Sequence, residues 1–487
     1  MKTETQSEAF FIAAIVSYFF AFFYVKWPLG NLTWPIITIA YLFLNDWFAS
    51  VTGHERTGES IFWAVIMILQ SIALAIYGPH EEILGFLQMF LMHAEAVYFV
   101  ISRTDLLAAS KTSSFLPEDL IFGFFVLPWS HLFLRLSVLK QKGGSKHALL
   151  RNAGYAVLIL VIVLFALGQL SEADEAFASS LSWLKNSVFF PSDFLLNLVL
   201  SIPIGMWLYG LCAGAMSSRQ KPEARLIRHK VPSGIFQILF SILTVIYLVF
   251  FLFSLRAFQN AFPIQTAAAA SEFAVRGFWN LIAILILNFA LLAAAEACAE
   301  SDSWKLNCFS WLILVFDLSG ICFAVLDGMK LYLYAHLFGA TLRRFYAAWA
   351  LGFFSAAAIA MLVRHHREFP LTRFLVLGGM SAFTVLSLLN SEHLVLREAL
   401  KQQNPDLQVL EECRFYEDPE VIPATKRLAE QGWFSGKSFY DISQLYGADA
   451  ESDGSSAVIA LNGSSYQLVL NLSEDGEEVI SAALAEQ

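Results

Sequence analysis

Long apolar runs, separated by short polar or proline-containing stretches, dominate the first 390 residues. A helix needs about 20 apolar residues to span hydrocarbon, where no backbone polar group can go unpaired. The runs therefore predict an all-α polytopic membrane protein with about twelve transmembrane helices. The predicted spans lie near residues 9–25, 31–48, 60–77, 83–102, 117–138, 149–168, 193–213, 233–254, 276–295, 307–328, 344–363 and 373–390.

Proline and glycine mark some of the boundaries between these spans. Pro28 and Gly30 separate the first span from the second, and Pro79 separates the third from the fourth, which predicts tight helical hairpins. Pro128 falls inside the fifth span, and because proline removes a backbone donor we expect a kink there.

The periodicity changes beyond Asn390. Residues 398–446 are polar with apolar residues at helical spacing and several prolines, which predicts short helices. Two apolar segments then flank Asn462 and Gly463, a pair typical of a β-hairpin turn, so we expect a hairpin over 457–472. The predicted division is a transmembrane helical domain, 1–390, and a small soluble α+β C-terminal domain, 391–487.

Composition supports the membrane assignment and locates the acidity. The chain is 57% hydrophobic and only 15% charged, with a mean hydropathy of +0.59. Its net charge is −10; residues 391–487 hold 18 acidic and 6 basic residues, a net of −12, so residues 1–390 carry +2. Nucleic acid and anionic headgroups would repel such a domain, so we expect a protein partner for it and no nucleic acid.

The distribution of Lys and Arg predicts the orientation, because basic loops stay in the cytoplasm. Three loops are basic: Arg135, Lys140, Lys142, Lys146 and Arg151; Arg219, Lys221, Arg225, Arg228 and Lys230; and Arg364, Arg367 and Arg373. With twelve alternating spans all three are cytoplasmic, and both termini lie outside. The fifth span is the weakest assignment, and a miscount there is expected to move the C-terminal domain inside.

Asp317 lies near the middle of the tenth predicted span. Ionisable groups within membrane spans are costly and are therefore functional candidates. Asp317 could act as a protonatable relay or a cation ligand. We favour the competing interpretation, a carboxyl group hydrogen-bonded to a neighbouring helix for packing.

His93 and Glu95 form a second candidate intramembrane polar site, about ten residues into the fourth predicted span. Residues two apart lie on different faces of a helix, so a metal or catalytic pair is the less favoured interpretation. A hydrogen-bonded histidine and an inward-facing carboxylate are favoured.

A third candidate is a cluster of charged and aromatic residues at two predicted helix ends, on the outer face in the predicted topology. Arg276 follows Glu272 by four residues, which suits an intrahelical ion pair. The cluster could hold an anionic ligand or lipid headgroup, but we favour an interfacial aromatic belt with snorkelling cations. Its members are Glu272, Arg276, Lys330, Tyr334, His336, Arg343, Arg344 and Tyr346.

Motifs of nucleotide-driven and hydrolytic enzymes are absent from the sequence, which contains no GxxxxGK[ST], HExxH or GxSxG. The five cysteines show no spacing that a metal site needs. We therefore expect no metal, no cofactor and no catalytic residues of a familiar type.

The segments SEFAVRGFWNL and KLYLYAHLFGATLRRFYAAW resemble signatures of a bacterial family of polytopic membrane proteins, domain of unknown function 4153/4173. The first signature is matched by Glu272, Arg276, Gly277 and Phe278, and the second by Tyr334, Gly339, Thr341, Arg344 and Tyr346. Departures from the second are Lys330 and Leu342 in place of arginine, His336 in place of an acid and Phe338 in place of tyrosine. Weaker likenesses occur at Ser171 and near Asn390. The resemblance implies a multi-pass protein of the bacterial inner membrane, with no established activity.

Two functional hypotheses follow. The first is a non-enzymatic membrane component, either transporter-like or sensory and regulatory, surrounded by membrane lipids. The alternative is a membrane-embedded transferase acting on a lipid-linked or phosphate-bearing substrate, with Arg276 and Arg344 binding the phosphate.

Overall fold

The computed structural model describes residues 2–26, 30–78, 82–132, 192–218, 232–261, 278–298, 308–364, 367, 369–402, 404–418, 420–447, 451–452, 455–461, 466–473 and 475–486. These form two compact units. Unit 1 comprises Met1–Ile227 and Pro370–Leu388, and unit 2 comprises Arg228–Phe369 and Leu389–Gln487. Along the chain, the segment Pro370–Leu388 of unit 1 therefore comes between two segments of unit 2.

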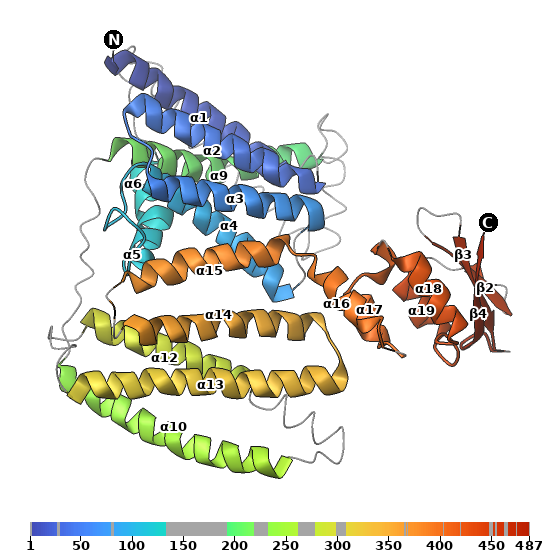
Figure 1. Cartoon of the computed structure of the whole chain (residues 1–487). Helices are drawn as coiled ribbons and strands as arrows, with labels where there is room; N and C mark the ends of the chain where they lie inside the picture. Colours follow the sequence, from blue (N-terminus) through green and yellow to red (C-terminus); the bar gives the residue numbers. More distant parts are fainter. Residues whose placement is uncertain are drawn as a thin grey trace, which may run out of the picture. The chain divides into compact units, whose positions relative to one another are not determined.

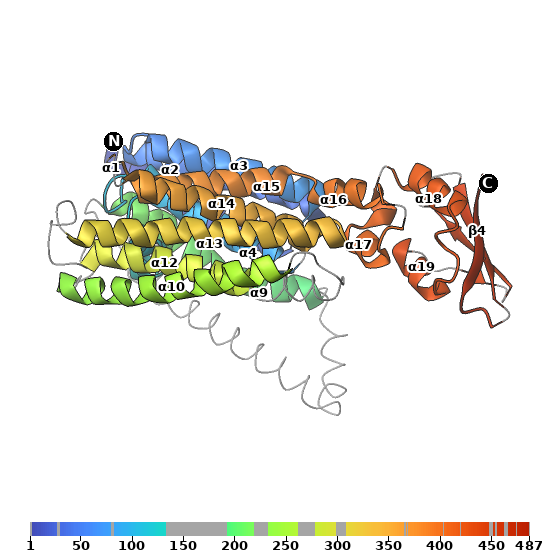
Figure 2. The same ribbon diagram turned by 60° about the horizontal axis from the view of Figure 1, so that its bottom comes forward.

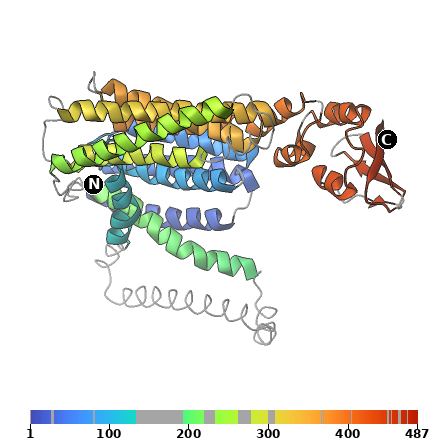
Figure 3. The ribbon, with the colours of Figure 1, turned by 90° about the horizontal axis from the view of Figure 1, so that it is seen from below.

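In unit 1 the long helices run side by side, and the short helices α5 and α6 lie across one end of them (Figures 1 and 3). Its helices are α1 (Lys2–Lys26), α2 (Thr33–Thr52), α3 (Gly58–Tyr77), α4 (Glu82–Arg103), α5 (Leu116–Ile121), α6 (Leu127–His131), α9 (Ser192–Ser217) and α15 (Leu371–Leu388). A capping box fixes the start of α3, where the backbone N–H of Ser60 donates to Thr57 Oγ1 over 3.1 Å. The core contains large aromatic side chains, among them Phe10 and Phe48 in edge-to-face contact.

Seven of the described helices are long and apolar enough to cross a membrane. They are Gly58–Tyr77, Leu84–Arg103, Leu196–Ser217, Gly234–Ser254, Trp311–His336, Leu342–Arg364 and Leu371–Leu388. Two shorter apolar helices, Ile12–Val25 and Leu281–Ala295, coincide with the first and ninth predicted spans. The sixth predicted span, 149–168, lies outside the described residues. The count of twelve spans is therefore not confirmed.

The fifth predicted span is not one continuous α-helix in its described part. It consists of α5, a π-helical turn at Phe122–Val126, and α6. The backbone N–H of Leu127 donates to Phe122 O, five residues back, immediately before Pro128. A π-helical turn lets the chain accommodate a residue that has no N–H, so the structure has this turn where the sequence predicts a kink.

The segment from α5 to α6 begins and ends at the same end of unit 1. The Asp119 carboxylate near its start accepts from the N–H of Ala108, just beyond α4. Near its close, the His131 ring lies against Gly214, two residues from Cys212, which contacts Asn45 next to Asp46. Leu116–His131 therefore does not cross the bundle.

An ion pair gives independent evidence on the count. Arg373, at the start of α15, lies 2.7 Å from Glu59, at the start of α3, so both helices begin at one end of unit 1. With twelve alternating spans, Glu59 would lie outside and Arg373 in the cytoplasm. The ion pair contradicts this alternation, because its two members lie at the same end of unit 1. Omitting the fifth crossing leaves an even number between them, which places both on one side.

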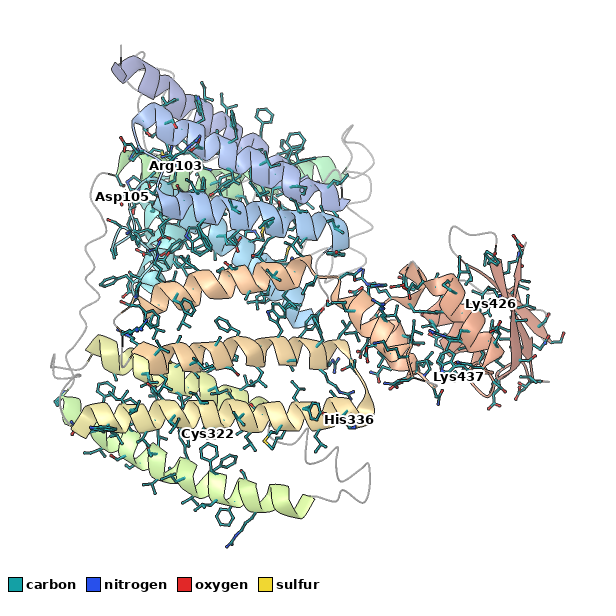
Figure 4. The ribbon with its side chains drawn as sticks, viewed as in Figure 1. Arg103, Asp105, Cys322, His336, Lys426 and Lys437 are labelled. Carbon is teal, nitrogen blue, oxygen red and sulfur yellow. The ribbon has the colours of Figure 1, made fainter. Side chains whose placement is uncertain are left out.

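The same end of unit 1 holds a second ion pair, in which the arginine is buried. The Arg103 side chain is only 2% exposed and donates to Asp46 Oδ1 over 2.8 Å, to His54 O and to Ser50 Oγ. Figure 4 shows Arg103 at the end of α4, beside the ends of its neighbours. Asp46 also accepts from Arg56, whose side chain is exposed. The ends of α2, α3 and α4 are thus joined by charge-assisted hydrogen bonds.

The membrane helices of unit 2 are α10 (Ser233–Ala261), α12 (Phe278–Cys298), α13 (Cys308–Phe338) and α14 (Leu342–Arg364). They lie side by side in Figures 1 and 2. Aromatic packing joins α10 to α13 through Tyr247 and Phe323, whose ring centroids are 4.8 Å apart. Although the sequence predicts a span ending near residue 328, α13 continues to Phe338 because no glycine or proline interrupts it between Met329 and Phe338.

The C-terminal part of unit 2 combines short helices with a small sheet. The helices are α16 (Ser391–Ala399), α17 (Leu407–Glu412), α18 (Val421–Glu430) and α19 (Phe439–Leu445), with a 3₁₀ turn at Phe415–Glu417. The strands are β1 (Glu451–Ser452), β2 (Ser456–Ala460), β3 (Tyr466–Leu472) and β4 (Val479–Glu486), antiparallel in that order. β2 and β3 occupy the position of the predicted hairpin, and β1 and β4 extend it to a sheet that the sequence does not predict.

Candidate functional site

The turn between α13 and α14 is built by one glycine and one arginine. Gly339 has φ +77°, in the left-handed region where a side chain is strained, and the Gln402 side chain fills the space beside its Cα. The Arg344 guanidinium donates to the carbonyl oxygen of Gly339, which closes the turn. The backbone N–H of Arg344 donates to Thr341 Oγ1 over 3.3 Å at the start of α14.

Aromatic rings pack on Arg344 and His336 at this turn. The Arg344 guanidinium lies over the Tyr334 ring, 4.1 Å from its centroid, in a cation–π contact. His336 is exposed near the end of α13 (Figure 4) and stacks on Tyr332, with centroids 6.0 Å apart. Arg343 is exposed. The structure thus brings Tyr334, His336, Arg343 and Arg344 to one helix-helix junction.

A groove of about 840 Å³ runs between α13 and α14 and ends at this turn. Its walls are mostly apolar, and the small residues Gly328 and Gly352 open it between the two helices. A Cβ at Gly352 would meet no atom within 4 Å. At the end near the turn the groove is lined by Thr341, Arg344 and Glu398. An apolar groove with a few polar groups gathered at one end suits an amphiphilic molecule.

The first helix of the C-terminal part contributes to this groove. Leu394, Val395 and Glu398 of α16 belong to its lining. Tyr346 Oη lies 2.9 Å from Ser391 Oγ, a hydrogen bond between α14 and α16. Ala340, Leu342 and Phe345 also pack against the core of the C-terminal part. The groove and the C-terminal part are therefore in direct contact.

Lys330 does not join the groove. It is half-buried on α13 and interacts electrostatically with Asp327, one turn earlier. Asp327 is fully buried, and neither carboxylate oxygen receives a hydrogen bond from the described residues. Asp327 gives no signal in the sequence, because it lies near the predicted end of a span, where a charge is less anomalous.

Asp317 is buried on α13, more than two turns before Asp327. The sequence places it in the membrane, and the structure places it within the packed helices of unit 2. Asn288 of α12 is also buried there and accepts from Tyr247 Oη over 2.7 Å.

His93 and Glu95 point in different directions from α4, as their spacing predicts. His93 is exposed; one ring nitrogen lies 2.6 Å from Met89 O and the other 2.7 Å from Tyr24 Oη. Glu95 is buried, and its Oε1 accepts from Gln70 Nε2 over 2.7 Å. The two residues belong to separate polar contacts.

Glu272 and Arg276 lie outside the described residues, so their predicted place in the cluster stays a prediction. Within the ranges that the structure describes, no group of three His, Cys, Asp or Glu side chains could hold a metal ion. Sequence reasoning missed Glu398, Gln70 and Thr384. Gln70 was detectable as an amide in an apolar run, whereas Glu398 lies in a polar segment that gives no signal.

Comparison with known proteins gives one match. The family model described as Domain of unknown function (DUF4153) matches residues 36–422, from the start of α2 to the start of α18. No curated protein and no solved structure gives a significant match.

Proposed function

The chain is a multi-pass membrane protein that belongs to the DUF4153 family, whose description names no activity, and we propose that it is a non-enzymatic sensory component that binds an anionic lipid. The lipid occupies the groove between α13 and α14, and its headgroup contacts Arg344 and Thr341. The observation that carries the proposal is the groove itself, which joins apolar helix walls to a cation and to α16.

The guanidinium of Arg344 supports a lipid with an anionic headgroup as the occupant. Arg344 is the cation in the lining, and it stands beside the Thr341 hydroxyl at the end away from the apolar walls. A guanidinium suits phosphate because its N–H groups match the phosphate oxygens. The groove lies between two helices of membrane-spanning length, which have lipids as their solvent.

The contact with α16 supports a sensory role. A headgroup beside Arg344 lies next to Glu398 and to the Tyr346–Ser391 hydrogen bond, so occupancy can shift the packing of α16 on α14. A ligand changes a conformation when it favours one arrangement over another. We infer that the acidic C-terminal domain, residues 391–487, passes this change to a protein partner.

The decisive experiment replaces Arg344. Full-length Arg344→Ala is purified in mild detergent. We expect the amount of anionic lipid that co-purifies with it to be lower than for the wild type by a factor of about ten or more, because the variant loses the charge-assisted hydrogen bond to the headgroup. Arg343→Ala, the exposed neighbour, is the matched control and should retain the wild-type amount. Mass spectrometry of the co-purified lipid measures both.

A second variant separates binding from damage to the turn, since Arg344 also bonds to Gly339. Gly352→Leu fills the groove without touching Arg344, and it should also displace the lipid. Gly378→Leu on α15, where a Cβ likewise meets nothing within 4 Å, is its control. Unchanged lipid content in both Arg344→Ala and Gly352→Leu would exclude the binding role.

A transferase acting on lipid-linked phosphate is the second candidate, because the groove also presents the Glu398 carboxylate near Arg344. A carboxylate within reach of a bound phosphate can act as a general base. In that case the wild type converts the bound lipid on incubation with an acceptor, whereas Glu398→Gln binds the lipid and leaves it unchanged. Lipid that stays intact with the wild type excludes this candidate.

We further propose that the protein lies in the bacterial inner membrane with its C-terminal domain on the outer face. The basic loops identified from the sequence all follow the fifth segment. Because these loops set the cytoplasmic side, omitting a crossing at that segment moves the N-terminal helices to the other side and leaves the C-terminal domain where it was. The expectation that a miscount there moves the C-terminal domain inside is therefore replaced as well. The N-terminus is then cytoplasmic, on the side of the basic loops, and the expectation that both termini lie outside is replaced.

A further inference from the structure

Three polar side chains from three helices meet inside unit 1. They are Gln70 of α3, Glu95 of α4 and Thr384 of α15, and each is at most 2% exposed. Gln70 Nε2 donates to Glu95 Oε1 over 2.7 Å and to Thr384 Oγ1 over 3.3 Å. The Thr384 hydroxyl donates its own hydrogen to Met380 O over 2.8 Å. The Gln70 amide is thus the hydrogen-bond donor that holds the three groups together.

Acceptors outnumber donors in this group. Glu95 Oε2 and Gln70 Oε1 are buried, and neither receives a hydrogen bond from any residue that the structure describes. Within the same residues Glu95 forms no ion pair. An ionised carboxylate without a compensating charge is very costly in an apolar interior. The site therefore lacks one positive charge.

We propose that Glu95, Gln70 and Thr384 bind one exchangeable monovalent cation, a proton or a sodium ion, which neutralises Glu95. A proton on Glu95 Oε2 supplies the missing donor. A sodium ion is instead coordinated by the Glu95 carboxylate, the Thr384 hydroxyl and Gln70 Oε1, once the Gln70 amide turns over so that Oε1 takes the place of Nε2. Because the hydrogen bond from Gln70 to Thr384 joins α3 to α15, the cation also governs how α15 packs on α3.

Other titratable groups near Glu95 must be separated from it. His93 and Tyr24 form their contact on the exposed side of α4, and Tyr41 of α2 donates to Ala96 O over 2.9 Å. The packed residues facing Glu95 from α3 and α15, Gln70 and Thr384, do not titrate. His93 is the ionisable side chain two residues from Glu95 on the same helix, so His93→Gln is the essential control.

The test follows the thermal unfolding midpoint of the full-length protein in detergent. With a proton in the site, the folded protein retains a proton that the unfolded chain releases, so the midpoint falls as pH rises. In choline chloride we expect a fall of about 3 °C or more between pH 5 and 8. Glu95→Gln, a neutral isostere, should lose this response, and His93→Gln should keep it.

The second arm replaces choline with sodium at pH 8. A sodium ion in the site raises the wild-type midpoint and leaves Glu95→Gln unchanged, whereas a proton-only site gives no sodium effect. If Glu95→Gln does not fold, Thr384→Val, which removes one oxygen, should reduce whichever response the wild type shows by at least about half. A pH response that vanishes in His93→Gln, or wild-type and Glu95→Gln curves that coincide in both arms, would overturn the proposal.

Discussion

Asp46 pairs with two arginines whose surroundings differ, so their contributions to stability can be compared directly. The Arg103 side chain is 2% exposed, and the Arg56 side chain is 66% exposed. Removing a partner from a buried pair costs far more than removing a solvated one, because the groups left behind stay desolvated.

Arg103→Leu is expected to lower the free energy of unfolding by about 3 kcal/mol, since His54 O and Ser50 also lose a donor. Arg56→Leu should lower it far less, because water screens the exposed Arg56–Asp46 pair. Unfolding of both variants in mixed micelles measures the difference. Equal losses would contradict the interpretation that burial decides the energy here.

The Cys413 thiol gives a pH-dependent prediction for the C-terminal domain. Burial, together with the charges of Glu392, Glu412 and Asp418, raises the pKa of this thiol from 9.0 to about 12. The folded domain retains the proton that the unfolded chain loses near pH 9. The thiol's contribution to stability is therefore complete below pH 9 and is lost as pH rises towards 12.

Alkylation measures the same effect at one residue, because the thiolate is the reactive form. At pH 9 we expect iodoacetamide to modify Cys413 at least about 100-fold more slowly in the folded protein than after denaturation. Peptide mapping by mass spectrometry locates the label. Comparable rates before and after denaturation would show that the folded thiol is neither buried nor protonated.

At the scale of single residues, sequence reasoning identified some candidates and missed their partners. Helical spacing was enough to place His93 and Glu95 on different faces of α4. The partners of Glu95, Gln70 and Thr384, come from helices distant in the chain, and no local pattern encodes such a contact. Asp327 escapes notice in the sequence because the pattern predicts a span end at residue 328, whereas α13 continues for ten more residues.

Among the helices, the packing of α6 on α9 depends on glycine. A Cβ at Gly210 would lie 2.4 Å from Pro128 O, and the backbone cannot yield as a flexible side chain can. Gly210→Ala should therefore lower the free energy of unfolding by about 1–3 kcal/mol. Gly378→Ala, which meets open space in α15, should leave it unchanged or raise it. Thermal unfolding compares them, and equal midpoints would mean that α6 is not held against α9.

Helix positions followed from hydropathy, whereas helix ends and crossings did not. Every predicted span within the described residues coincides with helical structure, because apolar length is a local property. Whether a segment crosses depends on what it packs against: Leu116–His131 is apolar, yet contacts with α4 and α9 hold it at one end. The turn between α13 and α14 likewise begins at Gly339, whereas the sequence predicts a span end near residue 328.

For the whole molecule, the orientation can be tested by cysteine labelling in intact cells. With native cysteines replaced, Ser435→Cys should react with a membrane-impermeant maleimide from outside. Thr3→Cys and Glu55→Cys should react only after permeabilisation, because omitting the fifth crossing moves the N-terminal helices to the cytoplasmic side. Labelling of Thr3→Cys from outside would contradict this topology and would indicate that the fifth segment does cross the membrane.

The two units could not be deduced from the sequence. Hydropathy suggests a boundary at residue 390, where membrane helices give way to a polar segment. The compact units divide the chain elsewhere, because α15 packs on α3 while its flanking segments belong to unit 2. Such an exchange depends on contacts across hundreds of residues, which composition does not record.

Because α15 comes late in the chain, its partners in α3 and α4 are synthesised well before it. Ribosomes add about 5–20 residues per second, so the 314 residues between Gln70 and Thr384 take about 15 to 60 s to make. Until α15 is made, Gln70 and Glu95 are in the bilayer without Thr384, and Glu59 has not yet formed its ion pair with Arg373. During that interval the nascent chain exposes polar groups that a membrane chaperone could shield or a quality-control protease could recognise.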